Sequence, residues 1–373
     1  MKNKSIKFNE PFKSTKIKKY VNESLNLNYY STGIFEEKCK ELLKNKFNIN
    51  NSLITHSATG ALELIAMYLK MKNNNSKAFM PSYTFSSTAN AFLRSGFNIE
   101  FLDVNLNDLM VNLREIKNIK DNDIIVPVHY SGQSIDFSHI NNFSKNIIVE
   151  DAAQGLGTKW KNKQIGTIGN FGAISFHHTK NIQSGFGGLL ISKFKEPMEK
   201  IQYIYERGTD RKKVTQGLKS KYEWVELGSS FQIPDLLSAV LLGQLEDFDI
   251  VIKKRRSLFN FYKNYFESFD SSLVRLPKFS IHSKSNFHAF YLIFNNSKHA
   301  QKFIAHNLSY GIDCYIGYVP LHNSKYGKKI GLNKQLLNTE KISKCIVRLP
   351  MHTNINEQDK KYLAQVFNKF FKI

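Results

Sequence analysis

The chain has 373 residues, 42% of them hydrophobic, and its 53 lysines and arginines against 31 acidic residues give a net charge of +22. This length and composition predict a folded protein with a sizeable core and about two domains. The basic balance is compatible with nucleic-acid binding, but no DNA- or RNA-binding module is visible and the lysines are spread along the whole chain. We therefore expect no nucleic-acid partner, since a basic surface also suits phosphate-rich small substrates.

Cysteine usage and hydropathy point to a cytoplasmic protein. The chain has three cysteines, and they lack the spacing of metal ligands: Cys39, Cys314 and Cys345. An odd number cannot all pair in disulfides within the chain, which is typical of a protein from a reducing compartment. The start, MKNKSIKFNEP, has no apolar run behind it, and no apolar stretch approaches the roughly 18 residues of a membrane helix. His177 and His178 are adjacent, but without Cys-x-x-Cys or HExxH they predict no metal site.

Short β-branched runs alternate with helical segments through the first two thirds of the chain. Expected strands are SLITH, AFM, IEFLDV, IIVPV, IIVE and AISF; expected helices include FEEKCKELLKNKF and ALELIAMYLK. This alternation predicts an α/β fold with a mainly parallel sheet flanked by helices. A long helical stretch over 234–266 follows, and we place a boundary near Asp247. Residues 1–246 then form a large domain with an N-terminal arm, and residues 247–373 a small α+β domain.

Polar or aromatic residues stand at or just after the ends of these expected strands. They are Thr59, Phe85, His129, Asp151, Ser175 and Lys180. Ligands of such sheets bind outside the carboxyl ends of the strands, so one shared pocket explains the set better than scattered core residues do.

Within this set, Lys180 follows AISF and precedes the glycines Gly185, Gly187 and Gly188. An acid, a hydroxyl, a lysine and a glycine loop in this order suit pyridoxal 5'-phosphate (PLP), which needs a lysine for its imine. Asp151 would pair with the pyridine nitrogen. The alternatives are a surface lysine and a helix N-cap aspartate, respectively.

Other residues complete the expected cofactor site. Gln154 could hydrogen-bond the ring hydroxyl, and Phe85 could stack on the ring, although a loop aromatic is more often part of a core. Thr59, Gly60 and Ser175 would hold the phosphate, because Thr59 stands at a strand-to-helix junction with free backbone N–H groups. A dinucleotide site is rejected, since no G-x-G-x-x-G follows a first strand.

In order and spacing, a series of motifs resembles the fold-type-I PLP aminotransferases that act on nucleotide-linked keto-sugars. The motifs are SATGALEL, MPSYTFSSTANAFLRSG, IIVPVHYSG, VEDAAQGLGT, GTIGNFGAISFHHTKN, GFGGLLIS, ERGTDRKK, KYEWVELGSSFQIPDLLSAVLLGQLE, YVPLH and VRLPM. FHHTKN, GTDR and KYEWVELGSS together are most similar to the branch that makes dTDP-4-amino-4,6-dideoxygalactose. Ser230 stands where many members place an asparagine that reaches the partner subunit's phosphate, and serine is typical of this branch.

The resemblance implies a homodimer with shared active sites, L-glutamate as amino donor and a 4-keto-6-deoxy nucleotide sugar as acceptor. It assigns the imine to Lys180, the ring nitrogen to Asp151, the ring hydroxyl to Gln154 and the phosphate to Thr59, Gly60 and Ser175. Candidate substrate contacts are His129, His177, Phe186, Arg207, Arg211, Tyr318 and His322. Arg207 and Arg211 could pair with a carboxylate or a pyrophosphate, and could equally be surface charges.

Two residues depart from the family pattern. Phe186 replaces an acidic residue between the loop glycines, and Gly60 stands where a small side chain is usual. Three alternatives stay open: a 3-amino-forming aminotransferase, a PLP-dependent sugar dehydratase, and a non-catalytic sensor or nucleic-acid-binding protein. The dehydratase branch carries histidine in place of the imine lysine, so Lys180 disfavours it.

Overall fold

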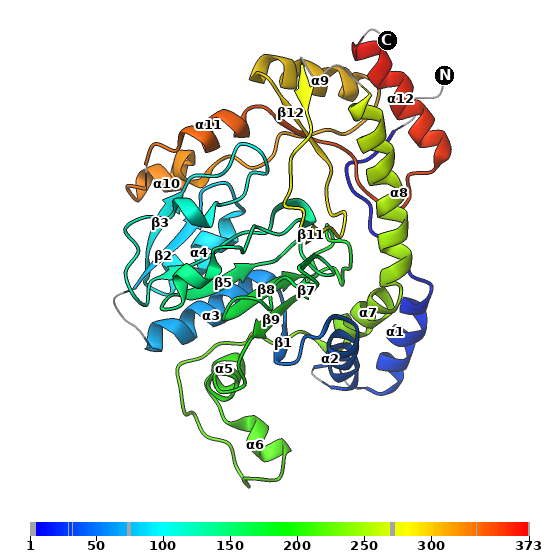
Figure 1. The fold of residues 1–373 in the computed structure, drawn as a ribbon. Coiled ribbons are helices and arrows are strands. Elements are labelled where there is room, and N and C mark those ends of the chain that lie inside the picture. The colour runs from blue at the N-terminus through cyan, green and yellow to red at the C-terminus, as the bar shows by residue number, and fades with distance from the viewer. Residues whose placement is uncertain are drawn as a thin grey trace.

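A seven-stranded sheet of order β1-β9-β8-β5-β4-β2-β3 forms the centre of the computed structural model (Figure 1). The structure describes residues 5–28, 30–31, 33–72, 76–268, 273–332 and 334–371. The strands are β1 (Ser52–Thr55), β2 (Lys77–Pro81), β3 (Asn98–Leu102), β4 (Ile124–Ile125), β5 (Ile147–Asp151), β8 (Phe171–Ser175) and β9 (Gly188–Ser192). Only β9 runs antiparallel to its neighbours β1 and β8. The predicted mainly parallel sheet is confirmed.

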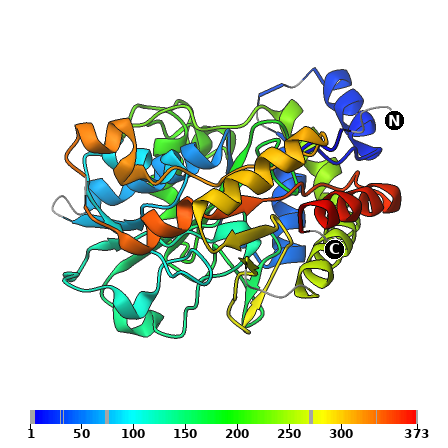
Figure 2. The same cartoon turned by 90° about the horizontal axis from the view of Figure 1, so that it is seen from above.

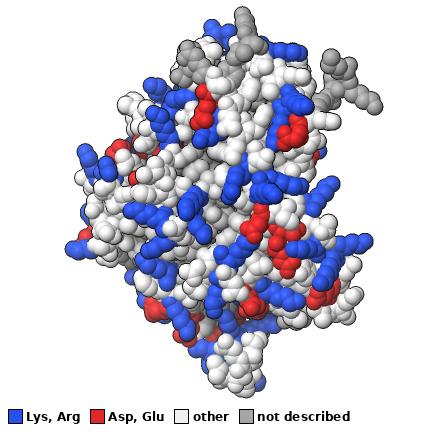
Figure 3. Space-filling model, turned by 45° about the vertical axis from the view of Figure 1, so that its right-hand side comes forward, with Lys and Arg blue, Asp and Glu red and all other residues white. Residues whose placement is uncertain are grey.

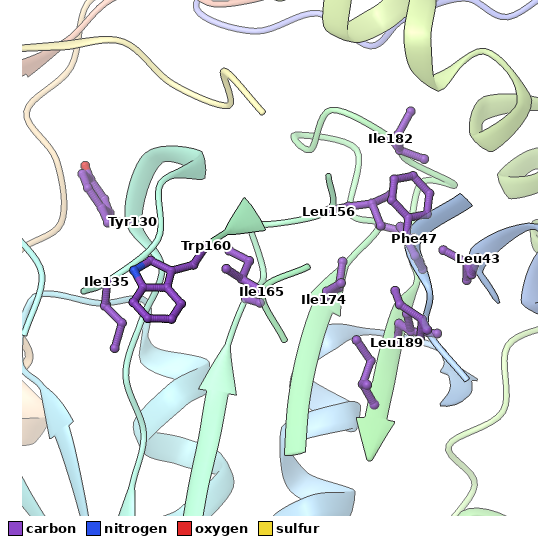
Figure 4. Packing of buried hydrophobic residues seen from close by; sticks show 14 of the residues in the cluster. Leu43, Phe47, Tyr130, Ile135, Leu156, Trp160, Ile165, Ile174, Ile182 and Leu189 are labelled. Atoms are coloured by element: carbon purple, nitrogen blue, oxygen red, sulfur yellow. The ribbon is translucent and has the colours of Figure 1, made fainter. Parts of the chain in front are cut away.

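Helices cover both faces of this sheet because successive strand residues point to opposite sides. Ile148 and Ile174 face a core built with α2 (Ile34–Phe47) and α7 (Asp235–Glu246). Figure 4 shows Ile174 and Leu189 in this core beside Leu43 and Phe47. Their strand neighbours Val149 and Ala173 face the other core, built with α3 (Ala58–Lys72), α4 (Ser86–Arg94) and α5 (Met198–Tyr205).

The predicted long C-terminal helical stretch is two helices. α7 ends at Glu246, and α8 (Phe248–Glu267) begins after Asp247, whose backbone (φ −93°, ψ 11°) leaves the helical region. α8 then runs along one side of the molecule to the C-terminal elements (Figure 1). The remaining helices of the first part are α1 (Lys16–Asn26), packed on α7, and α6 (Arg211–Thr215).

The C-terminal part has its own core. Its three-stranded sheet pairs β10 (Val274–Arg275), β12 (Tyr291–Phe294) and β13 (Ile346–Arg348), and α8, α9 (Ser297–Ser309) and α12 (Glu357–Phe371) pack with it. The described start of the chain joins this core, because Ile6 is buried there and donates its N–H to the Gly311 carbonyl. The labelled chain ends accordingly lie on the same side of the molecule (Figure 2).

Minor elements complete the chain. A second three-stranded sheet joins β6 (Lys159–Trp160), β7 (Lys163–Gln164) and β11 (Ser283–Lys284), and α10 (Lys325–Lys329) and α11 (Leu337–Ser343) lie beyond α9. The short 3-10 turns are η1 (Leu113–Glu115), η2 (Tyr130–Gly132), η3 (Ile140–Phe143) and η4 (Leu321–Asn323). The division into two domains at Asp247 stays a prediction, although separate cores lie on either side of it.

Candidate active site

Asp151 ends β5 at the carboxyl edge of the sheet, and its carboxylate is buried and held in place. Thr88 of α4 donates its hydroxyl to Oδ2 at 2.6 Å, and the backbone N–H of Ala153 donates to Oδ1 at 3.1 Å. The carboxylate is therefore oriented by protein groups before any ligand binds.

Lys180 lies near Asp151, in the loop that follows β8. Its backbone N–H donates to the His177 carbonyl, and its side chain lines a cavity of about 130 Å³ together with Gln154 and Tyr318. Burial lowers the pKa of Lys180 to about 8; the Asp151 carboxylate raises it against this trend, and the Arg348 cation lowers it. A larger share of the neutral amine is present near neutral pH than for an ordinary lysine, as a nucleophilic lysine requires.

Gln154 crosses the cavity from the turn after β5. The backbone N–H of Ser131 donates to its Oε1 at 2.7 Å, and its Nε2 donates to the Tyr318 hydroxyl at 3.3 Å. Burial raises the pKa of Tyr318 to about 12, so this hydroxyl stays protonated and can also donate. The ring of Tyr318 contacts the ring of Phe85, with centroids 6.2 Å apart.

The start of α3 forms a turn suited to a phosphate. Thr59 and Gly60 lie in its first helical turn, and the Thr59 hydroxyl is 2.6 Å from that of Ser87. Ser175 reaches the same region through strand pairing: Ser175 pairs with Gly188 of β9, whose missing side chain leaves space for the 57–58 backbone. A Cβ on Gly188 would lie 2.2 Å from that backbone. The structure thus brings the three predicted phosphate residues to one corner.

Two exposed aromatic residues stand at the mouth of this region. Phe85 is 59% exposed and Phe186 is 65% exposed. The ring of Phe186 meets His177 edge-on at 5.7 Å, and His177 is part-buried with a pKa lowered by burial and by the charges of His178 and Lys180. Their exposure leaves both phenylalanines able to contact a bound molecule.

Two predicted substrate contacts turn into the protein instead. His129 is fully buried, with Nε2 2.9 Å from the Glu150 carboxylate. His322 is buried as well, and its ring lies between the Ser82 hydroxyl at 2.6 Å and the Glu340 carboxylate at 3.3 Å. Both imidazoles have their hydrogen-bonding partners inside the protein. This geometry favours a role in holding the surrounding loops in place over contact with a ligand.

Three further predicted residues lie away from the Lys180 cavity within one chain. Arg207 is exposed and donates to Gln232 at 3.1 Å, while Arg211 begins α6. Ser230 is exposed on the segment that returns from α6. α6 lies below α5 at one end of the molecule in Figure 1.

Arg348 and His288 line the Lys180 cavity, and the sequence analysis did not single them out. Asn181 donates its Nδ2 to the Asn286 carbonyl, so its Oδ1 is the atom that accepts from His288 Nδ1, 3.0 Å away. The Nε2 of His288 is then unprotonated, and burial keeps its pKa well below the usual value. VRLPM carried the only sequence signal for Arg348, as a motif without an assigned role.

These residues fit PLP. A buried, oriented carboxylate can hold the pyridine nitrogen, a lysine of lowered pKa stands near it, and hydroxyl and backbone donors gather at a helix start. The groups come from the carboxyl ends of parallel strands, as in α/β enzymes generally. The fold and the site define a PLP-dependent enzyme of fold type I.

Comparison with known families makes this specific. The model of the DegT/DnrJ/EryC1/StrS aminotransferase family matches residues 11–368. The chain belongs to this family and is a PLP-dependent sugar aminotransferase, which confirms the predicted family, enzyme class and cofactor.

Among similar proteins is a UDP-4-amino-4,6-dideoxy-N-acetyl-beta-L-altrosamine transaminase of Campylobacter jejuni. It is 27% identical over 336 residues, which are 88% of this chain and 87% of the relative. A UDP-4-amino-4-deoxy-L-arabinose–oxoglutarate aminotransferase of Shewanella sediminis is 26% identical, with 91% of each chain covered. PseC of Helicobacter pylori, an aminotransferase of pseudoaminic acid biosynthesis, has a similar structure: TM-score 0.89, 22% identity, 99% of this chain and 100% of that chain covered.

The described part of the chain holds neither a cluster of metal ligands nor a helix able to span a membrane. No group of three or more His, Cys, Asp or Glu side chains there is arranged to hold a metal ion. Within the same residues, no helix combines the length and apolar character needed to cross a membrane. Lysines and arginines are scattered over the face shown in Figure 3 and do not gather into one stripe.

Proposed function

We propose that the enzyme transfers an amino group from L-glutamate to a nucleotide-linked 4-keto-6-deoxyhexose and forms a 4-amino-4,6-dideoxy sugar nucleotide. The observation that carries the proposal is Lys180 near the oriented Asp151 carboxylate, beside a phosphate-binding turn. The names of two relatives carry a 4-amino group on a UDP-sugar, which supports amination at C4. The sequence motifs favour a dTDP-4-amino-4,6-dideoxygalactose-like product, destined for a surface glycan such as lipopolysaccharide and made in the cytoplasm.

When bound, PLP would supply an electron-accepting ring that can carry the amino group from donor to sugar. Asp151 keeps the ring nitrogen protonated, and Thr88 fixes the carboxylate that does so. Gln154 contacts the ring hydroxyl, and its amide is already oriented by Ser131. Lys180 would hold the cofactor through its amine and, when that amine is free, could move a proton at the reacting carbon.

Contacts at the mouth of the site follow the same proposal. Phe85 stacks on the cofactor ring, and Tyr318, through its contact with Gln154, closes the far side of the cavity. His177 and Phe186 face the sugar, so the choice of sugar depends on this pair. Thr59, Gly60 and Ser175 bind the phosphate.

We further propose a homodimer in which residues 207–230 complete the partner's site. This segment carries large apolar side chains that one chain leaves uncovered: Leu218 is 70%, Trp224 78% and Leu227 64% exposed. A patch of this kind marks an interaction surface, and Ser230, Arg207 and Arg211 lie on the same segment. Light scattering of the purified protein tests this: Leu218→Glu with Trp224→Glu should give monomers that lose activity.

Turnover of PLP-loaded enzyme with L-glutamate and a panel of 3-keto- and 4-keto-6-deoxy sugars on dTDP, UDP and GDP tests the proposed reaction. We expect 2-oxoglutarate in equal amount to a product whose NMR spectrum places nitrogen on C4. Nitrogen on C3 would replace the proposal by the 3-amino alternative, and loss of a sugar hydroxyl without glutamate use would point to a dehydratase. Lys180→Ala is the control and should lose turnover while remaining folded.

A further inference from the structure

The segment 285–289 lies between β11 and β12 and connects walls of the Lys180 cavity that are distant along the chain. It belongs to no helix, and only its last residues lead into a strand. The Ser285 hydroxyl donates to the Gly132 carbonyl at 3.0 Å, and His288 lines the cavity. The contacts that hold this segment therefore also bear on the shape of the site.

Asn286 contacts two loops that carry cofactor-site residues. Its side chain is buried, and its Nδ2 donates to the carbonyl of Gln154 at 2.8 Å and to that of Leu156 at 2.9 Å. Its own carbonyl accepts from Nδ2 of Asn181, the neighbour of Lys180, at 2.8 Å. One residue thus bonds with both the turn that carries Gln154 and the loop that carries Lys180.

The residue type at position 286 suits these contacts in spite of an unfavourable feature. Both N–H groups of the Asn286 amide are used, whereas its Oδ1 is buried without a donor among the described residues. This oxygen lies against Gly132, where an added Cβ would collide with it. An apolar side chain would avoid the unpaired oxygen, but it would leave the carbonyls of Gln154 and Leu156 without their donor.

Arg255 of α8 holds the same segment from the side of the C-terminal core. Its Nε donates to the Phe287 carbonyl at 2.9 Å, and a second guanidinium nitrogen donates to the His288 carbonyl. Phe287 has φ 57°, a left-handed conformation that a bulky side chain rarely adopts. Burial lowers the pKa of Arg255 to about 9, which still leaves it protonated at neutral pH. Its hydrogen bonds go to backbone carbonyls, so the cation fixes this strained turn.

We infer that Asn286 is a positioning residue for the cofactor contacts, and that Arg255 keeps its segment in place. Asn286 holds the main chain of Gln154, whose Nε2 is the amide end left for a cofactor because its Oε1 accepts from a backbone N–H. Through Asn181 it also holds the loop of Lys180. Such groups must be held to a fraction of an ångström to react well. The inference rests on the proposed function, since it needs the roles proposed for Gln154 and Lys180.

The absorbance of bound PLP at different pH values tests this role, because it reports the pKa of the linkage between PLP and Lys180. A hydrogen bond from Gln154 to the ring oxygen favours the unprotonated linkage, in which that oxygen carries more negative charge. Asn286→Ala should therefore raise this pKa by about 0.5 to 1, as the loss of one ordinary hydrogen bond does. Arg255→Met, outside the cavity lining, should raise it by about 0.3 or more.

Asn307→Ala is the matched control for a loss of stability. Asn307 of α9 is also buried, its Nδ2 donates to the Phe303 carbonyl at 2.8 Å, and its Oδ1 is unpaired among the described residues. It does not line the Lys180 cavity. Both alanine variants should lose stability in urea, but only Asn286→Ala should change the pKa. An equal pKa change in Asn307→Ala would show a merely structural effect and would overturn the inference.

Two further outcomes decide the inference. A pKa within about 0.2 of wild type in folded Asn286→Ala overturns it, and if that variant does not fold, the same result in Arg255→Met does so. Borohydride reduction of the wild type and peptide mapping check Lys180 separately. An adduct on another lysine would overturn the proposed function as well, whereas an adduct on Lys180 with unchanged pKa in the variants rejects only the role of Asn286. Neither measurement needs a donor or a sugar.

Discussion

Glu150→Gln should destabilise the protein strongly although it leaves the reacting residues untouched. Glu150 precedes Asp151 on β5 and points to the opposite face of the sheet. Its fully buried carboxylate accepts four hydrogen bonds, from the backbone N–H groups of Gly166, Ile168 and Gly169 at 2.6–2.7 Å and from His129 at 2.9 Å. This network fixes the turn that leads into β8, and therefore the strand that carries Ser175.

The direction of the hydrogen bond between His129 Nε2 and Glu150 follows from the partner of the other ring nitrogen, Nδ1. The N–H of Ile135 donates to Nδ1, so the proton is on Nε2 and all four groups around Glu150 are donors. Glutamine keeps one acceptor oxygen and turns an NH2 group toward two of these donors. At about 1–3 kcal/mol for each buried donor left unpaired, the free energy of unfolding should fall by about 2–6 kcal/mol.

Equilibrium unfolding in urea, followed by tryptophan fluorescence and by far-UV circular dichroism, measures this loss. A loss of this size is a large part of the roughly 5–15 kcal/mol that stabilises a typical domain. The control is Glu37→Gln, an exposed carboxylate paired with Lys40, which should change stability by less than about 0.5 kcal/mol. The reasoning would be refuted if Glu150→Gln lost less than about 1 kcal/mol.

Three further predictions concern the cofactor site. The cofactor-free enzyme should bind PLP at Lys180 faster as the pH rises through about 8, because the neutral amine is the nucleophile; stopped-flow absorbance should not show a midpoint near the ordinary lysine value of about 10.4. Gly188→Ala should weaken PLP retention on dialysis, since its Cβ would lie 2.2 Å from the backbone of Ser57, and unchanged retention would contradict the phosphate corner. Gly60→Ala should destabilise the protein because its Cβ would lie 2.8 Å from the His56 ring; in a His56→Ala background the cost should shrink, whereas additive costs in urea unfolding would contradict this contact.

The residues that the sequence could place share a local rule. Asp151, Ser175 and Lys180 follow strands whose hydrophobic runs are readable, and parallel strands end at one edge of a sheet. The positions of these three residues at or just after the ends of predicted strands were enough to place them in one site. Gly188 follows the same logic, since it starts the strand that pairs with Ser175.

Residues outside this rule needed the folded chain. His129 also follows a strand, but a polar side chain at a strand end can point into the core instead of into the site. Here it donates a hydrogen bond to the buried carboxylate of Glu150. His322 behaves alike with Ser82 and Glu340. Sequence position fixes which edge such a residue occupies, but its rotamer depends on partners that are distant along the chain.

Arg348 and His288 illustrate the opposite case, in which the local sequence assigns no role to a residue that lines the cavity. Each reaches Lys180 through packing of the C-terminal core against the large sheet, more than 100 residues away along the chain: Asn181, next to Lys180, accepts from His288, and Arg255 of α8 donates to the carbonyl of Phe287. Lys180 thus comes from one part of the chain, and the arginine that lines the same cavity comes from the other. Any shift between these two parts changes the distance from Arg348 to Lys180, so the shape of the Lys180 cavity depends on how the two cores pack.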